Sequence, residues 1–439
     1  MQFGSRAAHR RALALAWPMI AANVTVPLVG AVNTAVLGHL PEAHFLGASA
    51  LGAVVFSFVY FSLAFLRTGT TGPVAQAQGA GDGAEVKATL YRALLLAGIA
   101  GVAMIILQVP IRWAAFEVLH ASPEIIENAR IYVSIRIWGA PAVLVNFVLL
   151  GWFMGLQNAR IGLLLQIVIN LVNLCLDLLF VLGLGWTIAG VAFANVIAEY
   201  SGAIVGLGFA LRRLPSLKGT VDRARLLDPA KLWRLFALNR DIFIRTLVLI
   251  SCLSSFTAIG ARFGDLTVAA NAILWTFHAF MAYALDGFAN AAESLVGDAI
   301  GARDRKQLDD RLAATTVWSA GVALAFSTAY WFAGPWIVAG LTDIPEVRAE
   351  ALKYLPWAAI SPLIAVWSFQ LDGIYWGAAR GREMRNSMIL AGLCFAATAW
   401  LLVPYFGNHG LWLAMMALMV VRAATLGARL PALLRSVDA

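Results

Sequence analysis

Residues 151–160 read GWFMGLQNAR, and residues 373–382 read GIYWGAARGR. An offset of 222 residues places Gly151 on Gly373 and aligns the second glycine of each segment as well. The same offset holds without a gap from Gly38 to Arg160, and its identical pairs include Gly38/Gly260, Ala48/Ala270, Phe58/Phe280, Asp82/Asp304 and Tyr132/Tyr354. A constant register over such a length predicts that the chain contains two copies of one structural unit.

The composition is that of a membrane protein with many spans. Of the 439 residues, 61% are hydrophobic and 13% are charged, and the mean hydropathy is +0.79. A soluble domain carries about 25% charged residues. Since a span needs about 20 apolar residues and lipid cannot hydrogen-bond the backbone, each long apolar run predicts a helix. We predict twelve, at 13–38, 46–70, 90–112, 131–155, 162–183, 188–211, 234–260, 268–295, 312–338, 353–378, 386–404 and 410–430.

The basic residues indicate how the helices are oriented. The N-terminal basic residues precede a run that lacks a small-residue cleavage site, so we expect a retained first helix. Most of the 32 Lys and Arg residues then fall on the side of the N-terminus, nine of them between 212 and 245. We also assign Arg422, Arg429 and Arg435 to that side, at the end of the last helix. The positive-inside rule places both termini in the cytoplasm, so the net charge of +8 needs no nucleic-acid partner.

The repeat and the spans together predict an all-α integral membrane fold of two six-helix bundles. We expect an N-terminal lobe at 1–211, a basic cytoplasmic linker at 212–233 and a C-terminal lobe at 234–439. Because each lobe has an even number of spans, both have the same orientation and are related by a pseudo-two-fold axis along the membrane normal. This organisation is typical of alternating-access transporters.

Polar side chains within the spans of the first lobe are the candidates for an ion site. Asn170, Asn173 and Asp177 form one stripe along the fifth span. Counted along their helices, Asn33, Asp177 and Asn195 lie at a similar depth in the outer half of the membrane. Asn146 lies in the fourth span, and Glu199 follows Asn195 by one turn. Such a group can bind a proton on Asp177 or coordinate a small hard cation.

The second lobe carries a different set of polar residues: Asp286, Asn290 and Glu293 on the eighth span, Asp372 on the tenth, and Arg240 with Arg245 at the start of the seventh. At the 222-residue offset, Asp177 meets Ala399 and Asn173 meets Phe395, so the glycines repeat and the acids do not. We therefore interpret the acids as specialised. Those of the second lobe either form structural or gate-closing ion pairs with Arg240 or Arg245, or contact substrate.

The sequence contains none of the nucleotide-binding, catalytic or metal-binding motifs that are typical of soluble enzymes. There is no phosphate-binding G-x-x-x-x-G-K-[ST] motif, no catalytic set, and no Cys/His cluster for a metal. Cys175, Cys252 and Cys394 each lie alone in an apolar run. Arg136 is expected to be satisfied by a partner or to reach the membrane interface. We expect no enzyme and no cofactor, and an ion gradient, H⁺ or Na⁺, as the energy source.

Several segments resemble the multidrug and toxic compound extrusion (MATE) family, most closely its bacterial DNA-damage-inducible (DinF-like) branch. They include LAWPMIAANVTVPLVGAVNTAVLGHL (15–40), FLRTGTTGPVAQAQGAGD (65–82) and VLLGWFMGLQNAR (148–160). The resemblance implies a V-shaped pair of bundles in the bacterial inner membrane. It also implies export of amphipathic, often cationic small molecules in exchange for H⁺ or Na⁺. We expect the partners of the protein to be these small molecules and the lipid bilayer, and we expect the transporter to be a monomer.

The resemblance also assigns roles to individual residues. It implies an ion site in the first lobe, here Asn33, Asn146, Asn173, Asp177 and Asn195. It further implies that the first helix bends at its prolines, here Pro18 and Pro27, when the site is protonated and drug is released.

One residue departs from the family pattern. Relatives read VDTAV where this chain reads VNTAV, so the usual titratable aspartate is Asn33. Coupling must then depend on Asp177 or Glu199, use another ion, or be weak. Two alternatives remain open: a lipid or lipid-precursor flippase, and an uncoupled pore or receptor-like relative. A major-facilitator transporter would carry a basic G-x-x-x-D-R-x-G-R loop, which QAQGAGDGAEVK lacks.

Overall fold

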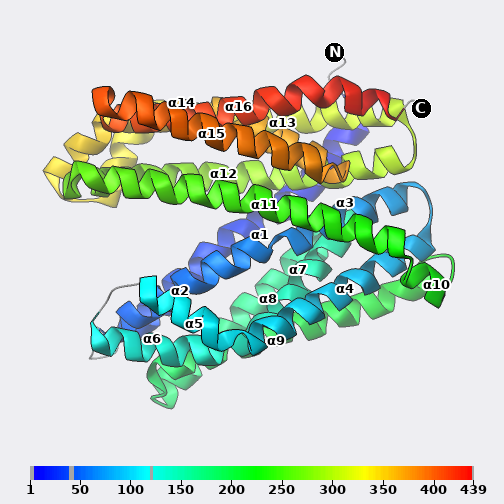
Figure 1. Cartoon of the computed structure of the whole chain (residues 1–439), viewed down its shortest axis with the longest axis horizontal. Coiled ribbons are helices and arrows are strands. Elements are labelled where there is room, and N and C mark those ends of the chain that lie inside the picture. Colours follow the sequence, from blue (N-terminus) through cyan, green and yellow to red (C-terminus); the bar gives the residue numbers. More distant parts are fainter. Residues whose placement is uncertain (1–3, 39–43, 119–121, 438–439) are drawn as a thin grey trace. The chain divides into compact units, whose positions relative to one another are not determined.

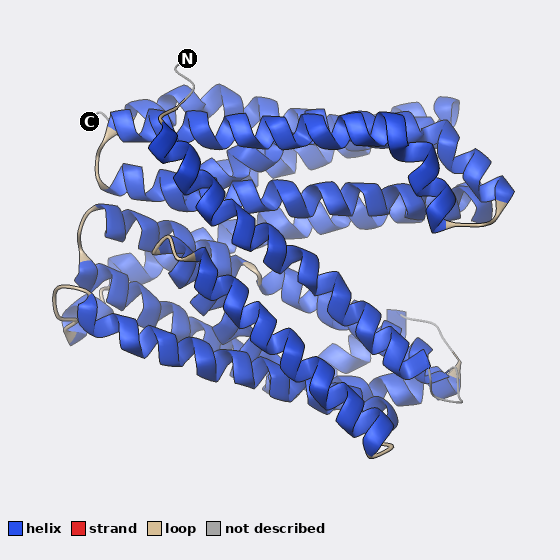
Figure 2. Ribbon diagram, turned by 180° about the vertical axis from the view of Figure 1, so that it is seen from behind, coloured by secondary structure: helices blue, strands red, loops and turns tan. Residues whose placement is uncertain are grey.

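The structure is a computed structural model that describes residues 4–38, 44–118 and 122–437. Within the first helix, the side chains at 26–29 and 31–36 lie outside this description, and Pro27 and Asn33 are among them. All regular secondary structure in the described ranges is helical (Figure 2). The predicted all-α fold is confirmed.

The described residues form two compact units, and two helices cross from one to the other. The first unit comprises Ala21–Trp233, and the second comprises the chain up to Ile20 and from Arg234 onward. Helix α1 (Arg6–Gly38) is thus divided at residue 20, and α11 (Pro229–Gly260) near its start. We expected residues 1–211 to form one lobe. The start of α1 packs instead on second-unit helices, where Ser5 Oγ donates to Asp310 Oδ2 at 2.6 Å.

The first unit contains the remainder of α1 and the helices that follow it (Figure 1): α2 (His44–Leu63), α3 (Phe65–Gly79), α4 (Gly83–Ile106), α5 (Gln108–Val118), α6 (Pro123–Arg136), η1 (Ile137–Gly139), α7 (Ala140–Gly155), α8 (Ala159–Asp177), η2 (Leu178–Gly183) and α9 (Thr187–Arg213). Helix α7 packs on α3, α4 and α9, and α8 packs on α9. Trp152 and Phe153 of α7 are fully buried in the core of this unit.

The second unit is built from longer, less interrupted helices: α11, η4 (Ala261–Phe263), α12 (Asp265–Gly301), α13 (Arg305–Leu341), α14 (Pro345–Gly377), α15 (Gly381–Phe406) and α16 (Asn408–Arg435). Helix α12 packs along α14, and α15 packs along α16. At the 222-residue offset α12 corresponds to α2 and α3, α14 to α6 and α7, α15 to α8, and α16 to α9.

The repeated glycines occupy equivalent helix crossings in the two units. A Cβ atom on Gly151 would lie 2.3 Å from the carbonyl oxygen of Arg67, and one on Gly373 would lie 2.2 Å from that of Ala289. Arg67 and Ala289 are themselves 222 residues apart. No real Cβ tolerates such a distance from a backbone atom, so only glycine lets α7 approach α3, and α14 approach α12, this closely.

Two further local features repeat at the same offset. Asp82 caps α4 by accepting a hydrogen bond from the Glu85 amide at 3.0 Å, and Asp304 caps α13 by accepting one from the Gln307 amide at 2.9 Å. The turn that follows α7 holds Gln157 at φ 58°, and its counterpart after α14 holds Ala379 at φ 54°. The repeat read from the sequence is therefore a repeat of structure.

We expect Gly373→Ala to destabilise the second unit by about 1–3 kcal/mol or more, because the added methyl would overlap the Ala289 carbonyl. Gly321→Ala is a matched control, since it lies within α13 and a Cβ there would have no neighbour within 4 Å. That control should be neutral or stabilising. Thermal denaturation followed by size-exclusion chromatography compares the two variants. Equal midpoints would show that the close crossing is not required.

The basic linker is held against one end of α4. It contains η3 (Leu214–Ser216) and α10 (Arg223–Leu226), and Arg225 Nη1 lies 2.8 Å from Asp82 Oδ1. Burial alone would raise the pKa of Asp82, but the hydrogen bonds from Glu85 N and Arg225, together with the charge of Arg225, outweigh burial and lower it. The lowered pKa keeps Asp82 ionised at neutral pH, so this attachment weakens only as the pH falls through that lowered value.

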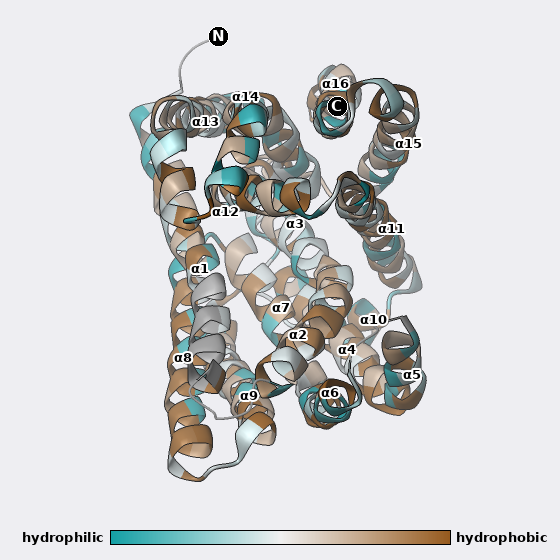
Figure 3. Ribbon diagram, turned by 90° about the vertical axis from the view of Figure 1, so that its left-hand side faces the viewer, coloured by the Kyte–Doolittle hydropathy of each residue, from teal (hydrophilic) through white to brown (hydrophobic). Residues whose placement is uncertain are grey.

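The outward faces of both units are apolar. Trp17, Ile106, Trp336 and Trp400 have exposed fractions of 70%, 72%, 75% and 76%. Hydrophobic residues, drawn brown, predominate along the helices of both units (Figure 3). Soluble proteins rarely expose large apolar surfaces, whereas lipid contact requires them.

Ten of the helical segments in the described ranges are long and apolar enough to cross a membrane, and α14 is as long but more polar. Eleven of the twelve predicted spans lie on one long helical segment to within a residue, whereas the third, 90–112, passes the end of α4 at Ile106 and continues into α5. Most of these segments run several residues beyond the predicted ends. For example, the predicted 312–338 lies inside α13, Arg305–Leu341. The extensions carry charged residues, which lower the mean hydropathy, so a hydropathy criterion ends the predicted spans before the helices end.

Candidate functional site

The candidate ion site of the first unit contains a buried acid at a break in helix geometry. Asp177 is the last residue of α8 and is 0% exposed, and Asn173, one turn earlier, is 2% exposed. Directly after Asp177, η2 is a π-helical turn. In the second unit, α15 continues as a regular helix through Ala399, the counterpart of Asp177. Such turns are rare and occur frequently at functional sites.

The second acid of this unit, Glu199 of α9, has a different environment. Asn146 of α7 donates from Nδ2 to Glu199 Oε2 at 2.9 Å and to its backbone oxygen at 3.0 Å. Arg136 of α6 is 8% exposed and donates from Nη2 to Glu199 Oε1 at 3.4 Å. Within the membrane a paired arginine compensates a carboxylate charge, so Glu199 belongs to an ion pair. Two outcomes were expected for Arg136, a partner or a position at the membrane interface. The structure shows a partner, Glu199.

Aromatic rings surround the Arg136 guanidinium. Its Cζ lies 5.7 Å from the ring centroid of Phe56 and 5.6 Å from that of Tyr60, both in α2. In the described part of the chain, Arg136 Nη1, Asn146 Oδ1 and the Tyr60 hydroxyl are buried without a hydrogen-bond partner. Cation–π contacts stabilise the arginine without neutralising it. Glu199 is therefore its counter-charge.

The remaining amides of this unit hold helices together. Asn195 donates from Nδ2 to the Val191 carbonyl of its own helix at 2.8 Å. Asn170 accepts from Gln166 at 2.8 Å and donates to the Thr25 carbonyl of α1 at 3.5 Å. The common depth predicted for Asn33, Asp177 and Asn195 stays a prediction.

The first-helix residues are described only in part. Asn33 and Pro27 lie in α1, but their side chains fall outside the described residues. Pro18 is buried within the second unit. The roles predicted for these three residues therefore stay predictions.

The polar centre of the second unit is a buried cluster of one acid and two arginines. Asp372 of α14 is 3% exposed, and its Oδ2 accepts from Arg245 of α11 and, at 2.5 Å, from Arg422 of α16. The guanidinium of Arg245 also lies 5.4 Å from the ring centroid of Trp376. One carboxylate thus ties three helices together.

One sequence-based assignment in this unit is wrong, and the expected pairing of an acid with Arg240 or Arg245 is confirmed for Arg245. Arg422 was assigned to the cytoplasmic end of its helix, but α16 continues to Arg435 and leaves Arg422 mid-helix and 3% exposed. Arg240 was a candidate partner for the intramembrane acids, but it is largely exposed and pairs with its neighbour Asp241 at 3.1 Å. Of the two arginines considered, Arg245 pairs with Asp372.

The other acids of the second unit lie on α12. Glu293 is 0% exposed and Asn290 is 3% exposed, whereas Asp286 is half-buried. The carbonyl oxygen of Glu293 would lie 2.2 Å from a Cβ on Gly377, so its position is fixed by the crossing of α12 and α14.

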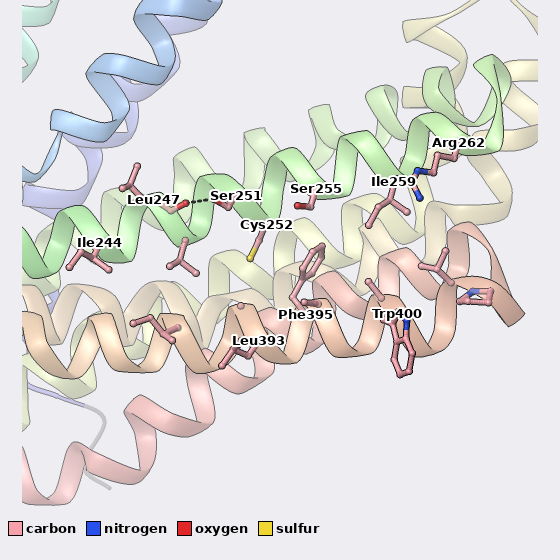
Figure 4. A pocket seen from close by; sticks show the side chains of 17 residues that line it. Ile244, Leu247, Ser251, Cys252, Ser255, Ile259, Arg262, Leu393, Phe395 and Trp400 are labelled. Atoms are coloured by element: carbon pink, nitrogen blue, oxygen red, sulfur yellow. Dashed lines mark hydrogen bonds between the residues drawn. The ribbon is translucent and has the colours of Figure 1, made fainter. Parts of the chain in front are cut away.

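A large apolar groove runs between α11 and α15 (Figure 4). Its volume is about 860 Å³, and its walls include Leu247 and Cys252 of α11 and Phe395 and Ala399 of α15. Cavities of about 300–1,000 Å³ with mainly apolar walls are those that bind drug-sized ligands. Sequence reasoning did not locate this groove, because it follows from the spacing of two helices rather than from a motif.

Comparison with known proteins agrees with this architecture. The MatE family profile matches residues 18–179 and again 242–403, once in each repeat. The chain is 44% identical to DNA damage-inducible protein F of Escherichia coli, over 94% of this chain and 90% of that protein. It is 28% identical to the probable multidrug resistance protein NorM of Rhizobium meliloti, over 98% and 94%. A crystal structure of MATE in the bent conformation superimposes with a TM-score of 0.88 at 19% identity, covering 98% and 97% of the two chains.

Repeated membrane-spanning helices with buried ionisable groups are typical of membrane transporters. The two profile matches and the 44% identity to the E. coli protein identify the family to which this transporter belongs. The chain belongs to the MatE family of multidrug transporters.

Proposed function

We propose that the chain is a secondary antiporter of the bacterial inner membrane with both termini in the cytoplasm. It exports amphipathic, often cationic compounds in exchange for H⁺ or Na⁺, and Asp177 carries the coupling ion. The observation that supports this most is the π-helical turn beside a fully buried acid, present in one repeat and absent from the other. A site that both scaffolds needed would occur in both.

The environments of the two first-unit acids favour Asp177 over Glu199. Arg136 and Asn146 already satisfy the Glu199 carboxylate. To exchange its ion, Glu199 would have to leave the arginine as an uncompensated buried charge, which is costly. Asp177 is followed by backbone whose hydrogen bonding is already irregular, so binding there can alter helix geometry at lower cost.

Drug efflux from proteoliposomes, with H⁺ and Na⁺ gradients imposed separately, tests the proposal. The wild type should export drug faster with one of the two gradients than without it. Asn33→Asp restores the acid of the family pattern, and we expect it to strengthen proton-driven efflux. Equal rates with and without either gradient would favour an uncoupled transporter or pore.

A further inference from the structure

The α11–α15 groove is the second-unit counterpart of the candidate ion site. At the 222-residue offset, Ser255 corresponds to Asn33, Phe395 to Asn173, and Ala399 to Asp177. Ser255, Phe395 and Ala399 all line the groove. The location that carries an acid and amides in one repeat is therefore open and apolar in the other.

The groove is long, apolar and charged at one end. Ile244 and Arg262 mark its extent along α11 and η4, and 18 residues at 1.5 Å each span about 27 Å. Among its described lining residues, Arg262 is the single charged one. Arg262 is exposed, and it makes no hydrogen bond or ion pair with the described residues. It lies at the end of α11 that is remote from the basic linker.

These features define the chemistry of an occupant. A slot of about 860 Å³ and about 27 Å in length suits one extended alkyl chain better than a compact drug. A guanidinium without a counter-ion at one end attracts a carboxylate, sulfate or phosphate and repels a cation. We infer that the groove binds a single-chain anionic amphipath, with its chain between α11 and α15 and its headgroup at Arg262.

This inference extends the proposed function, on which its physiological meaning rests: it adds anionic amphipaths to the compounds that the second unit accepts. The first repeat would then bind the coupling ion, and the second would bind an apolar chain at the equivalent position. The inference is about equilibrium binding, so it can be tested without any gradient.

The binding experiment uses cis-parinarate, a fluorescent fatty-acid anion, and the full-length protein in phosphatidylcholine nanodiscs, with empty nanodiscs subtracted. Competitors of equal chain length and opposite charge, dodecyl sulfate and dodecyltrimethylammonium, report the charge preference. For the wild type we expect dodecyl sulfate to displace the probe at a concentration at least about ten-fold lower than the concentration of dodecyltrimethylammonium that does so. This difference is expected for a charge-assisted contact.

Two kinds of variant test the contact with the ligand's alkyl chain and the contact with its headgroup separately. Ser255→Phe or Ala396→Phe should fill the groove and reduce probe binding at least about ten-fold, as steric exclusion requires. Arg262→Gln should remove the preference between the two competitors, whereas Arg112→Gln, an arginine of the first unit, should retain it. Each variant must elute as a single species in size-exclusion chromatography.

Two results would overturn the inference: equal displacement of the probe from wild type by both competitors, or unchanged probe binding in both filled variants. Neither result bears on ion-driven efflux, which is measured with a reference cationic drug. Conversely, an uncoupled transporter that still bound parinarate at Arg262 would refute the proposed coupling and leave this site standing.

Discussion

Asp177→Asn should reduce gradient-driven drug efflux to the rate measured without a gradient, a loss of at least about ten-fold if a single acid couples the two fluxes. Asn has nearly the same shape but cannot bind a proton, and it removes the charge that would attract a cation. Because the substitution is nearly isosteric at a buried site, drug affinity should change little. Efflux and drug binding are measured on the same preparation.

Glu199→Gln is the matched control. It leaves the Asn146 contact possible and removes the charge that compensates Arg136. We expect a lower yield of folded protein because the arginine loses its partner. The ratio of efflux with a gradient to efflux without one should nevertheless persist. The opposite pattern, with coupling lost in Glu199→Gln and kept in Asp177→Asn, would transfer the coupling role to Glu199.

The second large effect concerns stability. Asp372→Asn should destabilise the second unit by about 3–5 kcal/mol, because two buried arginines lose their common counter-charge. Asp309→Asn removes an exposed i,i+4 pair with Arg305 and should cost less than about 1 kcal/mol. Denaturation midpoints in one detergent give the comparison.

A triple variant distinguishes charge compensation from a specific need for the aspartate. Replacing Asp372 by Leu and both Arg245 and Arg422 by Met removes all three charges together. Buried ion pairs can often be exchanged for apolar residues at little cost, so stability should return near the wild-type value. If the triple variant is as unstable as Asp372→Asn, packing rather than charge governs this site.

The fold could be predicted because its determinants are periodic. Long apolar runs require helices, and the offset that aligned Gly151 with Gly373 also aligned the carbonyls they approach, those of Arg67 and Ala289. The ends of the helices were less predictable, since charged residues near those ends lower the hydropathy by which a span is recognised.

The site was only partly predictable. Sequence spacing shows that Asp177 and Asn173 share a helix face, but not that the helix changes geometry directly after Asp177. The pairing of Arg136 with Glu199, and of Arg422 with Asp372, depends on how helices distant in sequence pack. For Arg422 a signal existed, because the predicted span 410–430 already places this arginine near the middle of the last helix rather than at its cytoplasmic end.

The most direct test of coupling at Asp177 uses a gradient of the transported drug as the only driving force. A drug gradient is imposed across proteoliposomes that begin with no ion gradient, and internal pH and Na⁺ are followed with fluorescent indicators. Wild type should move H⁺ or Na⁺ against the direction of the drug, and Asp177→Asn should move neither. Drug movement by the wild type without any counter-ion, or undiminished counter-ion movement in Asp177→Asn, would contradict coupling at Asp177.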